Sequence, residues 1–326
     1  LGTLYNTYSF FALYANIDEF TYHEDEIALH DRPELDQWIL SELNTLIKWV
    51  DESYQDYEPT KAARAISHFV QENLSNWYVR LSRRRFWKGD YQHDKISAYQ
   101  TLYTCLSTGA QLIAPIAPFF SERIYKDLVK ATTKEAFESV HLSSFPKYDG
   151  TLVNPSLEGK MQTAQKISSL VLSIRQKEKI KVRQPLKKIM VPVLSTSQKE
   201  EIQAVSNLIC SEVNVKELEL LEDASGILVK NVKPNFKVLG PKYGKEMKTI
   251  ANAVAKLGQP AIQKIEQEGE ISLQLENKTI NLQLSDVEIT SRDIEGWLVA
   301  SAGPKTVALD VTIDDELRNE GIAREL

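Results

Sequence analysis

Cysteine is scarce in this sequence of 326 residues. Cys105 and Cys210 are the two present, far apart and without a CxxC pair, so neither a disulfide framework nor a thiolate zinc site is indicated. The five histidines are scattered, and none has a partner at the spacing of metal ligands. The sequence therefore predicts no metal site, and the reducing cytoplasm is the expected compartment.

Long hydrophobic runs are also lacking. The chain opens with an apolar stretch, Leu4 to Ala15, that is too short and too polar to span a bilayer. It has neither a basic leading segment nor a small-residue cleavage site, so we expect no signal peptide and no membrane association. The first residue is leucine, and the sequence stops inside a helical pattern at Leu326. We therefore expect a piece of a longer protein.

A catalytic constellation is absent as well. The segment from Lys237 to Gly244 carries two glycines beside lysines. It lacks the strand–loop–helix spacing of a phosphate-binding loop, and we interpret it as a structural turn. The acidic run Asp314 to Glu316 is typical of a helix N-terminus, where carboxylates interact favourably with the helix dipole. No catalytic residue and no cofactor site is predicted for this stretch of sequence.

Hydrophobic periodicity divides the chain into two parts. At this length, with 42% apolar and 26% charged residues, two globular domains are the better expectation. Over residues 1–150, apolar positions recur at spacings of three and four, which predicts long helices joined by short polar loops. The expected fold of this first domain is an up-and-down α-helical bundle. The helical segments are Leu1–Asn16, Pro33–Val50, Pro59–Leu81, Asp94–Leu112 and Phe119–Lys130.

Beyond Gly150 the period changes. One amphipathic helix covers residues 157–178, and short β-like runs then alternate with helical patterns, which predicts a smaller α+β domain over residues 151–326. The expected strands are Lys188–Leu194, Val215–Leu221, Ile227–Lys233, Glu270–Leu275, Thr279–Leu284, Val287–Thr290 and Thr306–Val311. The helical patterns lie near Gln198–Cys210, Lys245–Leu257 and Pro260–Glu268.

Positive charge is concentrated in two places. The net charge is −6, so a nucleic-acid-binding protein with this composition must gather its cations locally. The first cluster, from Asn76 to Lys88, places four arginines and a lysine among four aromatic residues. On a helix, Trp77, Arg80, Arg84 and Trp87 form one stripe, and Leu74, Tyr78, Leu81 and Arg85 form its neighbour. Arginines beside aromatic faces suit phosphates and unstacked bases. The alternative is that some of these arginines pair with acids on the next helix and that Trp77 and Tyr78 are core residues.

The second cluster runs from Arg175 to Lys188 and contains seven basic residues and one acidic residue. A helix C-terminus favours cations, which accounts for Arg175 to Lys179 without any ligand. That explanation does not extend to Lys181 and Arg183, for which contact with an RNA phosphate backbone is the sharper hypothesis.

Several of these segments resemble a known family. Trp38-Ile39-Leu40-Ser41 and the run from Leu74 to Trp87 are similar to the anticodon-binding helices of class I isoleucyl-tRNA synthetases. Pro118-Phe119 followed by Ser121-Glu122 resembles a stretch shared with the valyl and leucyl enzymes. In the second half, Val182-Arg183-Gln184-Pro185 and Lys233-Pro234-Asn235-Phe236-Lys237 point to the isoleucine enzyme. The resemblance extends over nearly the whole chain.

The resemblance implies a parent protein that uses ATP and Mg²⁺ to activate isoleucine and transfer it to its tRNA. The His-Ile-Gly-His and Lys-Met-Ser-Lys-Ser signatures of the catalytic domain are not in this sequence, so we expect this stretch to be catalytically inactive by itself and to hold no cofactor. Its expected partners are isoleucine tRNA and the catalytic domain of the same polypeptide. Some members end in a cysteine-rich zinc module, and no such cysteines occur here.

The residues expected to bind tRNA are chosen by charge and helical face. They are Arg80, Arg83, Arg84, Arg85, Trp87 and Lys88 in the first cluster, and Lys181 and Arg183 in the second. Two alternatives stay open at this point. The chain could be the same region of a related enzyme, above all the valyl one, or a helical interaction module without an RNA role.

Overall fold

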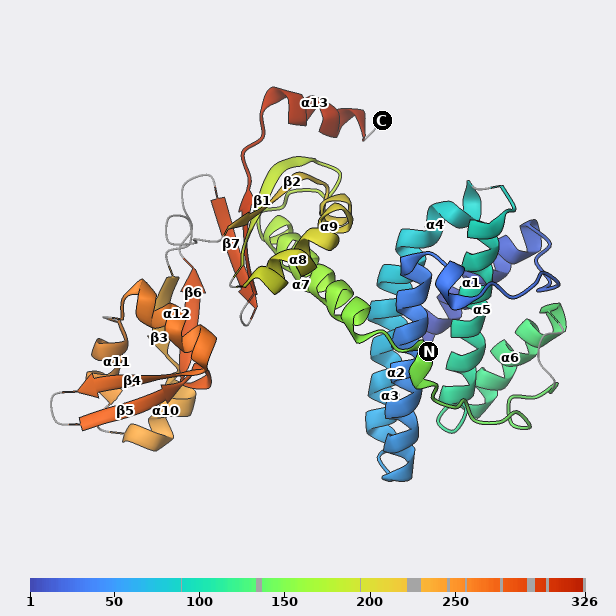
Figure 1. Cartoon of the computed structure of the whole chain (residues 1–326), viewed down its shortest axis with the longest axis horizontal. Coiled ribbons are helices and arrows are strands. Elements are labelled where there is room, and N and C mark those ends of the chain that lie inside the picture. The colour runs from blue at the N-terminus through green and yellow to red at the C-terminus, as the bar shows by residue number, and fades with distance from the viewer. Residues whose placement is uncertain are drawn as a thin grey trace. The chain divides into compact units, whose positions relative to one another are not determined.

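The structure is a computed structural model that describes residues 1–88, 90–132, 137–193, 195–221, 230–244, 247–255, 257–275, 278–291, 297–302 and 305–324. The chain divides into two compact units, Leu1–Gly159 and Lys160–Leu326. The division falls within helix α7 (Pro155–Lys177), whereas the sequence placed it before that helix. The fold class is the expected one, a helical bundle followed by an α+β part (Figure 1).

The first unit consists of long helices that bury one face each. Its elements are α1 (Gly2–Ile17), η1 (Leu29–Asp31), α2 (Glu34–Gln55), α3 (Pro59–His68), η2 (Phe69–Val79), α4 (Arg80–Trp87), α5 (His93–Ile113), α6 (Pro118–Thr132) and η3 (Gly150–Leu152). Trp38 and Val50 of α2 are fully buried, as their helical spacing predicts. α5 ends at Ile113, shortly before Pro115, because proline has no backbone N–H with which to continue the hydrogen bonds of the helix.

The second unit contains a four-stranded sheet in the order β2-β1-β8-β7. β1 (Leu186–Pro192) and β2 (Val215–Leu221) are parallel, and the crossover between them carries α8 (Thr196–Ala204) and α9 (Ser206–Val213). A parallel pair needs such a crossover. β7 (Trp297–Ala302) and β8 (Lys305–Asp310) complete the sheet as an antiparallel pair. The last described helix is α13 (Asp315–Ala323), whose N-cap Asp314 accepts a hydrogen bond from the Leu317 amide at 2.8 Å, as the acidic run predicts.

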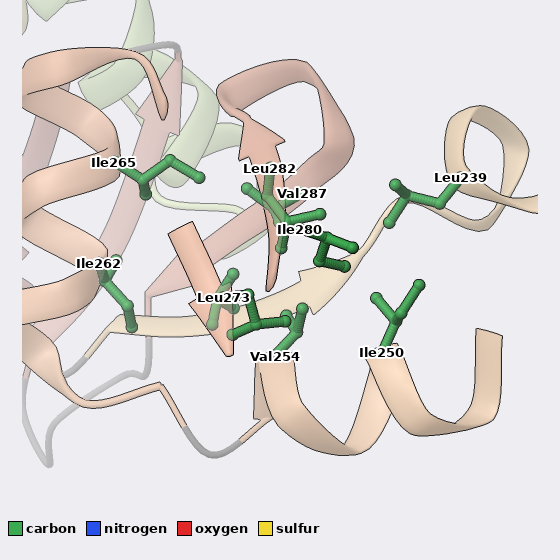
Figure 2. Close-up of a cluster of buried hydrophobic side chains, with 10 residues drawn as sticks. Leu239, Ile250, Val254, Ile262, Ile265, Leu273, Ile280, Leu282 and Val287 are labelled. Carbon is green, nitrogen blue, oxygen red and sulfur yellow. The ribbon is translucent and has the colours of Figure 1, made fainter. Parts of the chain in front are cut away.

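A small α+β lobe lies in sequence between β2 and β7. It is built from β3 (Lys230–Pro234), α10 (Phe236–Tyr243), α11 (Met247–Ala255), α12 (Gln259–Glu268), β4 (Glu270–Leu275), β5 (Lys278–Gln283), η5 (Leu284–Asp286) and β6 (Val287–Ser291). β3 pairs with β6 and β4 with β5, both antiparallel. Figure 2 shows its core, in which Ile250 and Val254 of α11 and Ile262 and Ile265 of α12 lie beside side chains of the strands.

Two expectations for the second unit are corrected here. The segment from Lys237 to Gly244 is not a turn, because α10 covers Phe236–Tyr243 and Gly244 follows it with a φ of +38°. Leu239 of this helix is completely buried in the core of the lobe, and that burial outweighs the weak helix propensity of the glycine and proline that follow it. β7 is absent from the sequence-based strands, since its Ala- and Ser-rich end lacks alternation. Residues 227–229 of one expected strand lie outside the described residues.

Candidate nucleic-acid interface

The first basic cluster lies at the end of a continuous helix that contains a π-helical segment. α3, η2 and α4 follow one another without a break from Pro59 to Trp87, and η2, residues Phe69–Val79, is π-helical. Such segments are rare and widen the helical turn. The buried residues of η2 recur in pairs four apart: Phe69 with Val70, Asn73 with Leu74, and Trp77 with Tyr78. Because the π-helical turn is wider, the side chain of Trp77 points into the core, where it is 7% exposed. Trp77 therefore does not belong to the arginine stripe that α-helical spacing predicts.

Arg85 is committed to partners inside the bundle. Its guanidinium donates to both carboxylate oxygens of Asp36, at 2.6 and 2.8 Å, and to Asp94 at 3.1 Å. Asp36 has no exposed surface and also accepts from the hydroxyls of Tyr78, at 2.9 Å, and Ser97, at 2.5 Å. Hydrogen bonds with Asp36 raise the pKa of Arg85 despite its burial. Arg85 therefore holds α4 to α2 and α5, which is the structural alternative weighed for this cluster.

The other members of the cluster face solvent. Arg80, Arg83, Arg84 and Lys88 are exposed, and the indole of Trp87 is 59% exposed. The ammonium of Lys88 lies 5.8 Å from the centroid of the Trp87 ring, a cation–π distance. Within the described residues, neither Arg83 nor Arg84 has an ion pair or a side-chain hydrogen bond. An exposed indole beside unpaired guanidiniums is a surface that suits a stacked base and its phosphate.

Aromatic packing makes the support of this surface rigid. Phe86 is 1% exposed and lies between the arginines and the bundle core. Its ring meets Phe10 of α1 and Tyr99 of α5 edge-on, with centroids 5.2 and 5.0 Å away. Each such pair adds roughly 0.5–1.5 kcal/mol beyond the area that it buries. The exposed arginines of α4 thus project from a helix that is fixed on its inner side by Phe86 and Arg85.

Two hollows in the first unit offer room for small groups. One, of about 660 Å³, lies between α2, α5 and the segment before η3, and its polar lining includes Arg32, Asn44, Gln111 and Lys147. The other, of about 410 Å³, is lined by Pro115, Pro118 and neighbouring residues. The sequence did not point to either, because their walls come from segments far apart along the chain.

The second basic cluster divides into a buried part and an exposed part. Arg175, the last buried residue of α7, is 1% exposed and donates to the backbone carbonyls of Lys181, Gln184 and Asn214. Lys188 of β1 pairs with Glu217 and Glu219 of the neighbouring strand β2, at 3.4 and 2.8 Å. Between them, Lys181 and Arg183 are exposed on a short turn. The structure therefore keeps these two residues at a surface and gives Arg175 and Lys188 structural roles.

Metal-binding and membrane-spanning features can be stated for the described residues alone. In that part of the chain no group of three or more histidine, cysteine, aspartate or glutamate side chains is arranged for a metal ion. None of the described helices combines the length and the apolar character that crossing a bilayer requires.

Comparison with known proteins bears directly on this surface. Residues 36–190 match the family model described as the anticodon-binding domain of tRNA ligase. The whole chain is 57% identical to part of the isoleucine–tRNA ligase of Bacteroides thetaiotaomicron, and 58% identical to part of that of Porphyromonas gingivalis. The chain is therefore similar over its whole length to a part of isoleucine–tRNA ligases, and within that length it matches an anticodon-binding domain. It spans 28% of the length of each of these two relatives.

The likeness to isoleucine–tRNA ligases reaches well beyond these two bacteria. The whole chain is also 40% identical to part of the isoleucine–tRNA ligase of Clostridium tetani, of which it covers 31%. The region matched by the family model begins at Asp36, the buried acid that holds Arg85, and includes both basic clusters.

Proposed function

We propose that this chain is the tRNA-reading part of an isoleucine–tRNA ligase, and that its helical unit binds the anticodon end of isoleucine tRNA. The observation that carries the proposal is the exposed surface of α4, formed by Arg80, Arg83, Arg84, Trp87 and Lys88, within a region that matches an anticodon-binding domain. Anticodon bases are single-stranded and can be unstacked, so an indole and planar guanidiniums can bind them.

Binding at this distance from the reacting ester serves the reaction indirectly. For the whole protein we propose the ATP- and Mg²⁺-dependent joining of isoleucine to its tRNA, in the cytoplasm, by a catalytic domain outside these residues. Binding energy from the remote anticodon end can align the acceptor end with that domain. No residue of this chain is assigned to the bond-making step.

Of the residues selected from the sequence, Arg85 is not retained in the proposed surface. Its guanidinium would have to leave a completely buried carboxylate to reach RNA. Breaking such a pair costs about 3–5 kcal/mol, which is more than one phosphate contact returns. Lys181 and Arg183 stay in the proposal as contacts to the RNA backbone.

The test is a filter-binding titration of the chain with isoleucine tRNA over a range of salt concentrations. Arg83→Gln and Arg84→Gln should each weaken binding several-fold and lower the salt dependence, since each lost phosphate contact removes about 0.7–0.9 from the log–log slope. Lys61→Gln is the matched control, because Lys61 is exposed near the start of the same long helix and pairs with Glu58. If all three variants lost the same amount of tRNA affinity, the loss would be explained by the change in net charge and not by contacts of Arg83 and Arg84.

The choice of tRNA discriminates between the candidate functions. Isoleucine and valine tRNAs, with their anticodons exchanged in a second pair of transcripts, should bind according to the isoleucine anticodon. Preference for the valine anticodon would assign the chain to the valyl enzyme instead. Weak binding without salt dependence to all four transcripts would leave only a helical interaction module.

A further inference from the structure

The exposed part of the second basic cluster is a tight turn. After α7 the backbone folds back so that the amide of Gln184 donates to the carbonyl oxygen of Lys181 at 3.0 Å. Val182 and Arg183 occupy the two central positions, and the Val182 side chain is 46% exposed although it is apolar. The turn leads directly into β1, which begins at Leu186.

All four carbonyl oxygens of this turn accept hydrogen bonds from two side chains. Arg175 donates to the carbonyls of Lys181, at 3.1 Å, and Gln184, at 3.0 Å. The side-chain amide of Asn214 donates to the carbonyls of Val182, at 2.8 Å, and Arg183, at 3.0 Å. Because Arg175 and Asn214 bind all four carbonyl groups, they stabilise the turn more strongly than its single backbone hydrogen bond does. The negative ends of its peptide dipoles are thereby directed toward Arg175 and Asn214.

Arg175 is a buried cation that has no counter-ion in the part of the chain that the structure describes. It is 1% exposed, and among the described residues no carboxylate pairs with it. Burial lowers the pKa of Arg175 to about 10, so the guanidinium stays charged at neutral pH. Its Nε has no hydrogen-bond partner among the described residues. A buried charge of this kind is costly unless something compensates for it, and an anion bound at the turn would do so.

The donors of the turn are available on its other side. Within the described residues, the backbone amides of Val182 and Arg183 meet no acceptor. The side chains of Lys179 and Arg183 are exposed next to them. Successive backbone N–H groups in a turn form a site for an anion, and nearby cations strengthen it.

Helix α13 fixes the turn from a distant part of the sequence. The side-chain amide of Gln184 donates to the carbonyl of Leu317 at 2.7 Å, and Arg324 donates to the Oδ1 of Asn214 at 2.6 Å. Gly321 leaves room for this contact, since a Cβ there would overlap the Oε1 of Gln184 and displace its side-chain amide. The backbone of Asn214 is left-handed, with a φ of +51°, a conformation that asparagine tolerates.

We propose that the turn Lys181–Gln184 is a phosphate-binding site, and that Arg175 and Asn214 are positioning residues that hold its donors toward one phosphodiester group of the RNA. The assignment of RNA as the ligand rests on the proposed function. The site would add affinity and orientation with little sequence information, because backbone amides and cations contact the phosphate rather than the base.

The first experiment measures tRNA affinity for Asn214→Gly in the full chain. Glycine keeps the left-handed backbone and removes the side-chain amide, so the turn loses the hydrogen bonds to two of its carbonyls. We expect affinity to fall by roughly three- to tenfold, the worth of one ordinary hydrogen bond. Lys177→Gln, which removes an exposed cation from the last turn of α7, is the control and should change affinity less. Circular dichroism melts check that both variants fold.

A double-mutant cycle separates positioning from general destabilisation. If Asn214 acts through the turn, Asn214→Gly should lower tRNA affinity in the native chain. The same substitution should lower affinity very little in a chain that already carries Lys181→Gln and Arg183→Gln, because the cations of the turn are then absent. Additive losses would overturn the positioning role. Wild-type affinity in Asn214→Gly would overturn it as well.

A second readout does not depend on RNA. In a titration of the ¹⁵N-labelled chain with inorganic phosphate, the amide signals of Val182 and Arg183 should shift and saturate, and Asn214→Gly should weaken that response several-fold. If these amides do not respond, the turn is not an anion site. If they respond while the native chain binds no tRNA, the proposed function fails and the anion site stands.

Discussion

The contrast between Arg85 and Arg84 on helix α4 leads to the sharpest prediction. The two arginines are neighbours in sequence, yet Arg85 is bound to the buried Asp36 and Arg84 is exposed without a partner among the described residues. We expect Arg85→Ala to destabilise the helical unit and Arg84→Ala to weaken RNA binding. Each substitution should leave the other property nearly unchanged.

The expected loss of stability follows from the contacts of Asp36. This carboxylate has no exposed surface, and Arg85 supplies two of its hydrogen bonds, at 2.6 and 2.8 Å. Removing one partner of a buried ion pair costs about 3–5 kcal/mol. Tyr78 and Ser97 continue to donate to Asp36, so we expect about 3 kcal/mol, at the lower end of that range. Arg84→Ala should change the unfolding free energy by less than about 0.5 kcal/mol, because surface substitutions usually do.

Urea unfolding followed by tryptophan fluorescence measures this difference. Trp38, Trp49, Trp77 and Trp87 belong to the helical unit and only Trp297 to the other, so the signal reports mainly on the helical transition. With a slope of about 2 kcal/mol/M, the Arg85→Ala midpoint should fall by about 1.5 M. Arg85→Lys should restore part of the loss, since an ammonium cannot reproduce a bidentate contact. The reasoning is refuted if Arg85→Ala unfolds like the native chain and loses RNA affinity to the same extent as Arg84→Ala.

Two further predictions concern buried ionisable groups. Burial, and next the nearby Glu158 carboxylate, raise the pKa of Glu42 from its ordinary 4.5 to about 7. A raised folded-state pKa favours the protonated form, so its contribution to stability is complete below pH 4.5 and is lost as the pH rises through 7. The unfolding free energy of the helical unit should fall between pH 5 and 8, and Glu42→Gln should make that fall smaller by about 1–3 kcal/mol. If the pH dependence is unchanged in Glu42→Gln, the burial argument is contradicted. Glu158→Gln should shift the titration of Glu42 to lower pH. Burial also raises the pKa of both thiols, but Cys105 is completely buried and Cys210 only partly, so a thiol reagent at pH 8 should modify at most Cys210 until urea unfolds the chain. Rapid reaction of two thiols in the native chain would show that the bundle opens readily.

Local patterns carried enough information to predict most of the helical unit and part of the proposed binding surface. The spacing of apolar residues predicts the long helices because a surface helix must bury one stripe. The same spacing already grouped Arg85 with Leu74, Tyr78 and Leu81, which are core-facing or half-buried here. From this grouping the sequence could have predicted that the side chain of Arg85 faces the core. The π-helical turn of η2 has no comparable sign, because packing rather than local propensity selects it.

Composition and periodicity by themselves determined that this chain is a helical bundle followed by an α+β part, with its positive charge in two clusters. Motif resemblance added the likeness to isoleucine–tRNA ligases, which the comparisons confirm over the whole chain. Tertiary structure alone decided which cations reach solvent. Arg175, Arg85 and Lys188 look like their neighbours in the sequence, and each is bound by groups distant along the chain. Charge is a property of the residue, whereas its availability depends on acceptors that only folding brings within hydrogen-bond distance.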